Sequence, residues 1–322
     1  MKIVTMDHWK KIYVLGAGSY GRVYYAVHID PSSSRAYVAA VKCADNSLSG
    51  SLQKEAQILT TLKGCPYVVQ FFGADVSIDN GNIPIYNLFL EYASGGSLHD
   101  LINNSKRGMI KMSELEVSFY TYQILKGIQH VHKKGYVHCD IKPANILVFN
   151  NERGGMHKLK LADFGLSLKV GDRMTYMTGI PLSNRGTLLY APPESLICGI
   201  HAKAYDIWSL GCTVVEMITG NRFWIHCDTK DLQWKIMNDE DPEIPSNVSE
   251  IARDFLHKCL ITDPVRRWTS DQLLDHPFIQ QALCTASMSM PETQEVTARV
   301  NPFGCQIPIP EKDFINALFK TS

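Results

Sequence analysis

Residues 138–145 read His-Cys-Asp-Ile-Lys-Pro-Ala-Asn, and residues 163–165, further along the chain, read Asp-Phe-Gly. Phosphoryl transfer from a metal-bound nucleotide requires oxygen ligands for Mg²⁺, a base for the attacking hydroxyl and a cation against the developing charge. Asn145 and Asp163 offer the metal-ligating oxygens. Asp140 is the expected base and Lys142 the expected cation. The two strings in this order, with a glycine turn and a lysine strand before them, predict a phosphoryl-transfer site.

Glycine residues dominate the upstream turn, which reads Gly16-x-Gly18-x-x-Gly21-x-Val23. This spacing alone also occurs in ordinary turns and in dinucleotide-binding sites, where a helix follows the glycines directly. Residues 22–27 are instead rich in strand formers, so we expect the turn to join two strands and to fold over phosphates. Leu15 and Val23 are expected to cover a planar base. The predicted nucleotide-binding stretch comprises Leu15, Gly16, Ala17, Gly18, Ser19, Tyr20, Gly21, Arg22 and Val23.

A lysine and a glutamate form a second predicted pair. Lys42 ends the strand-like run 39–42, and its alternative interpretation is a surface lysine at a strand end. In the predicted helix from Ser51 to Lys63, Glu55 shares the inward face with leucine residues. A buried carboxylate requires a cation, so we expect Glu55 to pair with Lys42 and to hold it on the nucleotide phosphates.

Composition limits the other classes of function. The chain has 322 residues, enough for two lobes, and its 32 Lys and Arg balance 32 Asp and Glu. No global positive charge favours nucleic acid or an anionic membrane, so neither is an expected partner. Nine cysteines without paired spacing fit reduced thiols in an intracellular protein. The start of the chain does not have the pattern of a signal peptide, and the apolar stretch from Ile207 to Ile218 predicts a buried core helix.

Two regions of different periodicity predict an α+β fold with two lobes. From Trp9 to about Leu90, strand-forming runs alternate with turns around a single helix, which predicts a small β-rich lobe. After Gly95-Gly96 the pattern becomes helical, and Ser113-x-x-Glu116 is a capping box. It opens an apolar stripe of Val117, Tyr120, Ile124, Ile128 and Val131. The segment 88–96 is expected to be a strand that ends in a connector beside a cleft.

The segment around Asp163 has the pattern of a hairpin. Strand-like residues 146–149 and 158–162 flank turn residues, and this hairpin is expected to carry Asp163 into the cleft. Prolines at 291, 302, 308 and 310 interrupt the chain beyond Ile279. Residues 280–322 are therefore expected to be a tail that packs on the larger lobe or is disordered, with at most one short amphipathic turn near Phe314.

Two alternative interpretations apply to the loop at 138–145. Its charges could be solvated in an exposed turn, but Asn145 and Asp163 complete a consistent ligand set. His130, His132, His138 and Cys139 could indicate zinc, but they lack a second ligand pair at structural spacing, so zinc is disfavoured.

These residues resemble the eukaryotic protein kinases over about Trp9 to Ile279. The sequence at 206–211 is similar to the start of the family's central helix, and Arg267 is implied to pair with Glu194. Lys142 after Asp140, and Gly186-Thr187 before Glu194, are similar to the serine/threonine branch. The resemblance implies an N-terminal extension (1–8), a kinase domain (9–279) with lobes at about 9–90 and 96–279, and a C-terminal tail (280–322).

Segments 87–96, 137–143 and 210–217 resemble plant MEKK-like mitogen-activated protein (MAP) kinase kinase kinases. This resemblance implies transfer of the γ-phosphoryl group of Mg-ATP to serine or threonine hydroxyls of MAP kinase kinases. It also implies backbone contacts from Glu91 and Ala93 to adenine, Leu90 at the gatekeeper position, and a base held between Ala40 and Leu147.

Four positions depart from the family pattern. Cys139 replaces the arginine that most members have before the catalytic aspartate, and a neutral thiol cannot bind a phosphate by charge. We therefore hypothesise that activity does not depend on a phosphorylated activation segment, although Thr175, Tyr176, Thr178 and Ser183 are acceptors there. Leu188, Pro192 and Phe223 also differ, and they bear on peptide docking rather than on nucleotide chemistry.

Two other classes of function remain open. A pseudokinase scaffold is the alternative from the class of binding proteins, and Lys42, Glu55, Asp140, Asn145 and Asp163 weigh against it. A metabolic kinase would not need the long segment between Asp163 and Glu194. No strong basic cluster indicates nuclear import, so we expect a cytoplasmic protein and leave entry into the nucleus open.

Overall fold

The computed structural model of this chain describes residues 9–18, 21–30, 35–79, 81–108, 111–151, 154–171, 188–223 and 244–289. The described part divides into two units. The first unit draws on residues 9–64 and 69–93, and the second on residues 65–68 and 94–289. Each unit is described by itself below.

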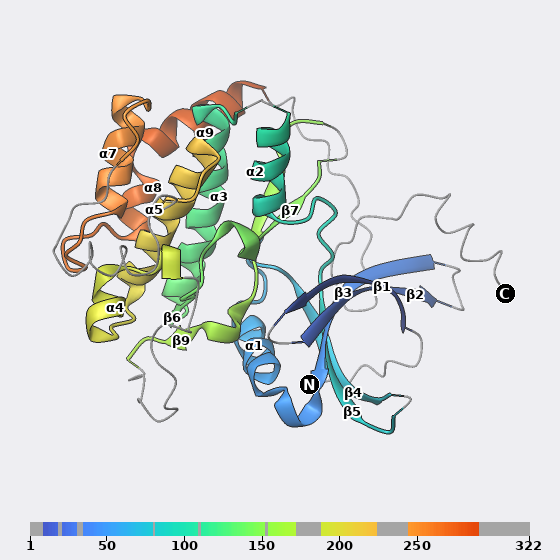
Figure 1. Cartoon of the computed structure of the whole chain (residues 1–322). Helices are drawn as coiled ribbons and strands as arrows, with labels where there is room; N and C mark the ends of the chain where they lie inside the picture. The colour runs from blue at the N-terminus through green and yellow to red at the C-terminus, as the bar shows by residue number, and fades with distance from the viewer. Residues whose placement is uncertain are drawn as a thin grey trace. The chain divides into compact units, whose positions relative to one another are not determined.

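The first unit contains a five-stranded sheet with strand order β1-β2-β3-β5-β4, in which all neighbours are antiparallel (Figure 1). Its strands are rich in valine, isoleucine and tyrosine, which suit a pleated, half-buried surface. One face packs into a core that includes Ala26, Val41 and Phe89. The strands are β1 (Trp9–Gly18), β2 (Gly21–Asp30), β3 (Arg35–Asp45), β4 (Phe71–Ile78) and β5 (Pro84–Leu90).

The α-helix among the described residues of the first unit is α1 (Gly50–Thr61), which follows the 3-10 turn η1 (Asn46–Leu48). Leu52, Glu55 and Leu59 are all buried on one face, as the helical spacing predicts. The prediction of a helix at 51–63 is confirmed, with ends shifted by one or two residues because helix ends fray.

The second unit is mainly helical (Figure 1). Two short antiparallel pairs of strands lie in this unit and carry the loops discussed below. The helices are α2 (Leu98–Arg107), α3 (Glu114–Lys133), α4 (Pro193–Cys198), α5 (Lys203–Thr219), α7 (Glu250–Cys259), α8 (Ser270–Leu274) and α9 (Pro277–Ser289). Strand β6 (Tyr136–Val137) pairs with β9 (Leu168–Lys169), and β7 (Ile146–Phe149) forms a hairpin with β8 (Lys158–Leu161). The 3-10 turns are η2 (Pro143–Asn145), η3 (Phe164–Leu166) and η5 (Leu188–Tyr190).

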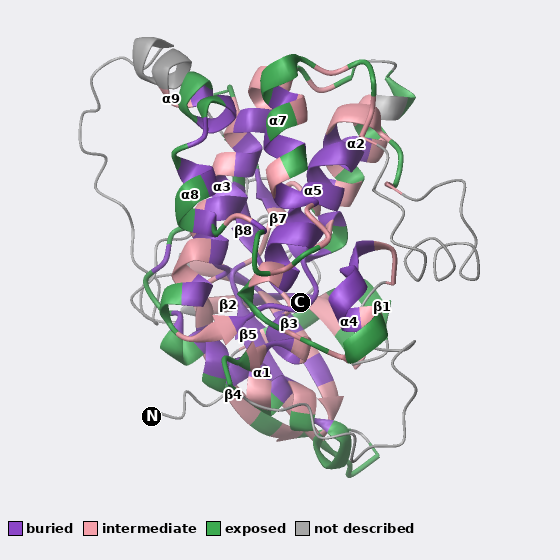
Figure 2. Cartoon of the chain, turned by 90° about the vertical axis from the view of Figure 1, so that its left-hand side faces the viewer, coloured by how far each residue is buried: buried purple, intermediate pink, exposed green. Residues whose placement is uncertain are grey.

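Helix α3 is the packing centre of the second unit, and it contacts α5, α8 and α9. Its predicted capping box is confirmed, because the Ser113 hydroxyl accepts from the Glu116 N–H while the Glu116 carboxylate accepts from the Ser113 N–H. The predicted stripe of Val117, Tyr120, Ile124, Ile128 and Val131 is buried. Figure 2 shows buried residues along α3 and α5, and the expected core helix at 207–218 lies within α5.

Three element boundaries differ from the expectations. Strand β5 begins at Pro84 instead of residue 88, and the polar Asn87 within it is buried and hydrogen-bonded. Strand β8 ends at Leu161, one residue early. Helix α9 continues past Ile279 to Ser289, since the first interrupting proline comes only at 291. Residues 290–322, including the expected turn near Phe314, lie outside the described residues.

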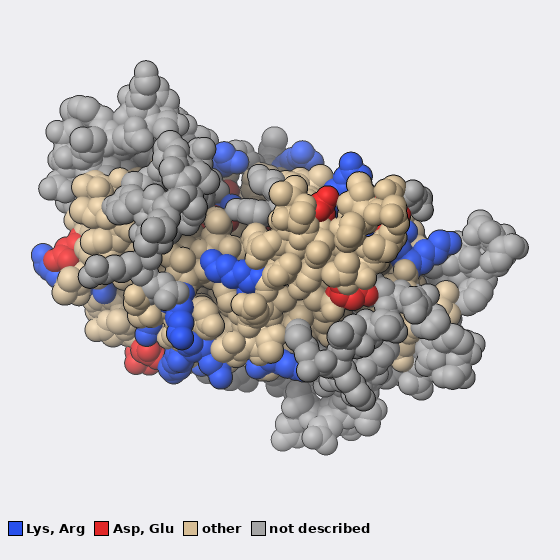
Figure 3. All heavy atoms as spheres, turned by 90° about the horizontal axis from the view of Figure 1, so that it is seen from below, with Lys and Arg blue, Asp and Glu red and all other residues tan. Residues whose placement is uncertain are grey.

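The described surface is mixed in charge. On the face in Figure 3, Lys and Arg side chains lie in separate groups, and acidic side chains stand beside some of them. Among the described residues, no helix combines the length and the apolar character needed to cross a bilayer.

Candidate active site

The catalytic-loop residues meet around the carboxylate of Asp140. The Lys142 ammonium donates to Asp140 Oδ2 at 2.8 Å, and the Asn145 amide donates to the same oxygen at 2.7 Å. Asn145 also donates to the Asp140 carbonyl at 2.9 Å, which closes the loop on itself. Asp140 Oδ1 has no hydrogen-bond donor among the described residues. One carboxylate oxygen is therefore fixed, while the other can accept a proton from an incoming hydroxyl.

Asp163 follows the end of β8, and a backbone hydrogen bond from its neighbour connects this segment to the catalytic loop. The N–H of Ala162, the preceding residue, donates to the Asn145 carbonyl at 2.9 Å. The predicted β7–β8 hairpin is confirmed, and Asn145 before β7 and Asp163 after β8 both lie at its open end, where Ile146 pairs with Leu161. Asp163 itself has a left-handed backbone conformation, with φ of 65°. The ring of the next residue, Phe164, packs on His138 with ring centroids 4.6 Å apart.

Asp206 positions the catalytic loop from α5, a role that the sequence analysis missed. Its fully buried carboxylate accepts the N–H groups of His138 and Cys139, each at 2.9 Å, and contacts His132 Nε2 at 2.8 Å. Burial raises the pKa of Asp206, but the His132 hydrogen bond and nearby histidines outweigh it and leave the pKa below its usual value. A carboxylate inside an apolar helix was the signal in the sequence, because such a group requires buried partners.

Cys139 lies in an apolar cluster. It is 5% exposed and packs with Val137, Ala191 and Tyr205. Its backbone has a positive φ of 64°, which a non-glycine residue rarely adopts, and the hydrogen bond to Asp206 fixes its N–H. The thiol therefore fills apolar space beside the catalytic base.

Lys42 and Glu55 form the predicted pair within the first unit. The Lys42 ammonium lies 2.9 Å from both carboxylate oxygens of Glu55, whose side chain is 1% exposed. Lys42 stands on β3 between Val23 of β2 and Leu88 of β5. Because Glu55 is buried and Lys42 remains 17% exposed, the glutamate fixes the lysine while its ammonium stays accessible.

The glycine turn joins β1 to β2, so the expected strand–turn–strand arrangement is confirmed. Gly18 pairs with Gly21, Ala17 with Arg22, and Gly16 with Val23. Gly21 has φ of 113°, and a Cβ there would lie 2.1 Å from the Cys43 carbonyl oxygen, so only glycine fits. Leu15 is 41% exposed on β1. Ser19 and Tyr20 lie outside the described residues.

The residues expected to hold adenine are divided between the units. In the first unit, Leu90 pairs with Ala40, and the Glu91 N–H donates to the Gln70 carbonyl at 2.9 Å. The Glu91 carboxylate accepts from the Gln70 N–H, which fixes the segment that continues to Ala93. Leu147 lies on β7 in the second unit, so its pairing with Ala40 stays a prediction.

The predicted Arg267–Glu194 pair is confirmed within the second unit. Arg267 donates to both Glu194 oxygens, at 2.7 and 3.0 Å, and its side chain is fully buried. Its remaining N–H groups donate to three carbonyls, and its guanidinium lies 5.1 Å from the Trp208 ring centre. The pair anchors α4, the helix that follows the activation segment, to the segment before α8.

The remaining sequence candidates are the residues considered for a zinc site, those that depart from the family pattern, and the expected phosphate acceptors. Among the described residues, no three His, Cys, Asp or Glu side chains gather as a metal site would require. His132 and His138 instead bond to Asp206 and to the Ala162 carbonyl. Leu188 lies in η5, Pro192 caps α4, and Phe223 follows α5. Gly186, Thr187 and the expected acceptors Thr175, Tyr176, Thr178 and Ser183 lie outside the described residues.

Comparison with known proteins agrees with this geometry. The protein kinase domain family matches residues 9–279. The chain belongs to the protein kinases. The match spans most of the chain and includes every residue named above as nucleotide-binding, metal-binding or catalytic, and the two-lobed α+β kinase fold is confirmed.

Curated relatives narrow the family further. Mitogen-activated protein kinase kinase kinase 20 of Arabidopsis thaliana is 37% identical over 276 residues, covering 84% of this chain and 78% of the relative. Mitogen-activated protein kinase kinase kinase 18 of the same plant is 37% identical over 84% of this chain and 77% of the relative. MAP kinase kinase kinase SSK2 of Saccharomyces cerevisiae is 34% identical over 85% of this chain and 19% of the relative. This kinase is a protein serine/threonine kinase.

Protein kinases generally use ATP and Mg²⁺, and the donor sets in each unit fit them. The Asn145 amide nitrogen donates hydrogen bonds to Asp140. Its amide oxygen therefore remains available, with Asp163, as a metal ligand. Lys42 supplies a fixed ammonium for phosphate oxygens. When bound, the metal ion would neutralise charge on the phosphates. The protein's own residues orient the acceptor hydroxyl and hold its proton at Asp140.

Replacing Lys42 by methionine is expected to lower kcat/KM for ATP by about 10² to 10³-fold, because one preorganised cation at the phosphates is lost. Steady-state kinetics against ATP measures the effect. Lys10→Met, at an exposed position on β1, removes the same charge and should leave kcat/KM unchanged. A Lys42→Met enzyme with wild-type kcat/KM would contradict the role of the pair with Glu55.

Proposed function

We propose that this kinase is a MAP kinase kinase kinase that transfers the γ-phosphoryl group of Mg-ATP to serine or threonine hydroxyls of MAP kinase kinases in a plant signalling cascade. Two findings together support the proposal: Asp140, Lys142 and Asn145 form an assembled catalytic loop, and the similar proteins are named MAP kinase kinase kinases. The catalytic loop supports phosphoryl transfer, and the relatives support the class of substrate.

A panel of MAP kinase kinases tests the proposal most directly. Each panel member is made inactive by mutation, so that any incorporated phosphate comes from this kinase, and the labelled sites are mapped by mass spectrometry. We expect phosphate on activation-segment serine or threonine residues of at least one member. Efficient labelling of a generic protein acceptor, with none of the panel, would retain the kinase activity and contradict the substrate class.

The alternative of a catalytically silent scaffold is not supported. Pseudokinases lose charged groups that a working site needs, whereas here Asp140, Lys142 and Asn145 are mutually bonded and Lys42 is paired with Glu55. A buried charge is costly unless it is paired, and the charges paired here are the ones that phosphoryl transfer requires.

The apolar surroundings of Cys139 predict activity without a phosphorylated activation segment. Because Cys139 packs with Val137, Ala191 and Tyr205, no cation at this position draws a phosphate toward the loop. Phosphatase treatment, checked by intact mass, should leave kcat within about twofold of the untreated enzyme. The matched comparison is Cys139→Arg, whose guanidinium would place a positive charge in the same cluster. Loss of most activity on dephosphorylation of the natural chain would refute the hypothesis.

The location of the kinase is part of the same proposal. We place it in the cytoplasm, because the sequence has no strong basic cluster that would direct nuclear import. Fluorescence microscopy of the tagged full chain tests this placement, and steady accumulation in the nucleus would contradict it.

A further inference from the structure

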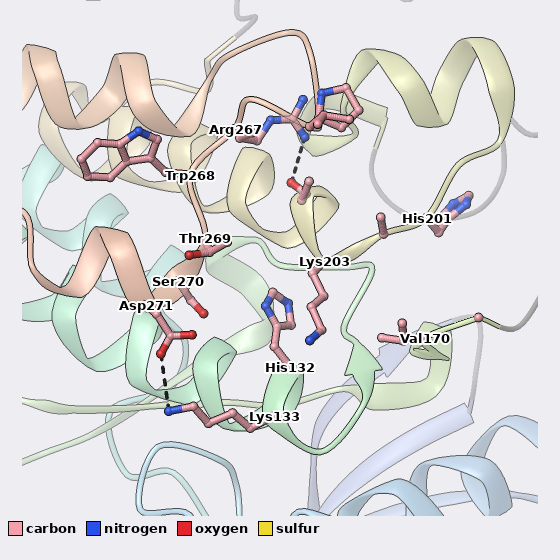
Figure 4. Close-up of a pocket in the computed structure, with 15 residues that line it drawn as sticks. His132, Lys133, Val170, His201, Lys203, Arg267, Trp268, Thr269, Ser270 and Asp271 are labelled. Carbon is pink, nitrogen blue, oxygen red and sulfur yellow. Dashed lines mark hydrogen bonds and ion pairs between the residues drawn. The ribbon is translucent and has the colours of Figure 1, made fainter.

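A cavity of about 560 Å³ opens in the second unit, and none of the residues assigned to catalysis, metal or nucleotide lines it. Its walls come from the end of α3, the start of α5, the chain just before α8 and the segment after β9 (Figure 4). These four segments are distant in sequence and meet only in the fold. The nature of the side chains that converge here indicates which ligand would fit.

Ser270 places a buried hydroxyl in this cavity. The residue is 3% exposed, and its hydroxyl bonds to no other described residue; it is not one of the buried side-chain atoms that lack a partner, because its oxygen reaches the open space of the cavity. Figure 4 shows the side chain turned toward the hollow, on the side where His132 lies. This hydroxyl can exchange its hydration for a hydrogen bond to a ligand that enters the cavity.

Lys203 supplies an uncompensated positive charge. Its exposed side chain points into the same hollow beside His132, and it has no ion-pair partner among the described residues (Figure 4). The neighbouring carboxylates are already engaged. Asp206 is bonded to His132, Glu194 to Arg267, and Asp271 lies 3.4 Å from the Lys133 ammonium. One cation therefore remains available for an anionic ligand.

The start of α5 adds to the positive potential. The helix has 17 residues, and its N-cap, Ala202, offers no side-chain acceptor to the first N–H groups. Ala202, Lys203 and Ala204 all line the cavity. Unsatisfied N–H groups at a helix start attract a negative charge, as the Lys203 ammonium also does.

Apolar side chains border the charged groups. Val170 is 48% exposed and Val265 is 90% exposed, and both line the cavity. Large exposed apolar residues beside a hollow are typical of surfaces that bind another protein. The ligand should therefore carry an apolar group next to its negative charge.

We propose that this cavity binds an acidic segment of a partner protein. One aspartate or glutamate carboxylate accepts from the Lys203 ammonium and the Ser270 hydroxyl, and an adjacent apolar side chain packs on Val170 and Val265. A carboxylate fits better than a phosphate dianion, because only one cation is uncompensated and the second, Lys133, is held by Asp271. The proposal does not depend on the substrate class proposed above.

The test uses the full chain and a fluorescently labelled, amidated octapeptide of alternating glutamate and leucine, titrated by fluorescence anisotropy. Saturable binding is expected. Lys203→Glu should weaken it at least tenfold and Ser270→Ala severalfold, whereas the charge-matched Lys111→Glu, at an exposed residue that does not line the cavity, should not. A peptide with glutamine for glutamate, or with glycine for leucine, should bind at least tenfold more weakly.

Activity on a generic peptide acceptor serves as the check on folding, and Lys203→Glu should retain it. Wild-type peptide affinity in folded Lys203→Glu, or no saturable binding by the natural chain up to millimolar peptide, would overturn the proposal. Equal competition by inorganic phosphate and by the acidic peptide would also overturn it, since the cavity would then select a small anion and not a protein segment.

Discussion

Asp140→Asn is expected to lower kcat by about 10² to 10⁴-fold, the range that a positioned general base contributes. Asparagine has nearly the same shape and can still accept from Lys142 and Asn145, which hold Asp140 Oδ2 at 2.8 and 2.7 Å. It cannot take up a proton from the acceptor hydroxyl. The variant should therefore fold and should bind ATP with an affinity within a few fold of the natural enzyme.

Single-turnover kinetics and nucleotide titration together separate the two parts of this prediction. Asp275→Asn makes the same chemical change at an exposed residue after α8 and should leave kcat unaltered. If Asp140→Asn keeps kcat within about threefold of the natural enzyme, Asp140 is not the base. If ATP affinity falls as far as kcat, the residue holds the nucleotide instead.

Replacing Arg267 by alanine is expected to destabilise the second unit by about 3–5 kcal/mol, because it leaves the Glu194 carboxylate buried without its cation. The side chain of Arg267 is fully buried and also donates to the carbonyls of Ile261, Thr262 and Ala204. These acceptors would lose their partner at the same time. Urea or thermal unfolding, followed by circular dichroism, measures the loss.

Three further variants sharpen this measurement. Arg266→Ala, the exposed neighbour, should change stability by less than about 0.5 kcal/mol. Arg267→Lys keeps the charge but not the two-pronged geometry, so its loss should be intermediate. The double variant Arg267→Met with Glu194→Leu removes both charges and should recover part of the stability. Equal stability of Arg267→Ala and the natural chain would contradict this account.

Much of the fold and of the candidate site could be predicted because the decisive signals are local. The helical period placed Glu55 on a buried face, and the cost of an unpaired charge then selected Lys42 as its partner. Alternation and turn residues predicted the β7–β8 hairpin, and the capping box located the start of α3. Each of these arguments needs only residues close together in the chain or a single long-range pairing.

Contacts between distant segments could not be predicted in this way. Asp206 reaches the N–H groups of His138 and Cys139 across 68 and 67 residues, and nothing at 138–139 indicates which carboxylate receives them. The meeting of Lys203 with Ser270 in one cavity has the same origin. The burial of the polar Asn87 within β5 likewise depends on neighbours from other strands, including Lys11 and Asp75.

Two of the described non-glycine residues with left-handed backbone, Cys139 and Asp163, have a consequence for how this enzyme could evolve or be engineered. Each such conformation costs about 1–3 kcal/mol in a non-glycine residue. Cys139 adjoins the base Asp140, and Asp163 is itself the expected metal ligand. A substitution that relaxed either turn would raise the melting temperature while releasing the base or the metal ligand from its position. Thermostable variants selected without regard to turnover should therefore tend to lose catalytic power at these two turns.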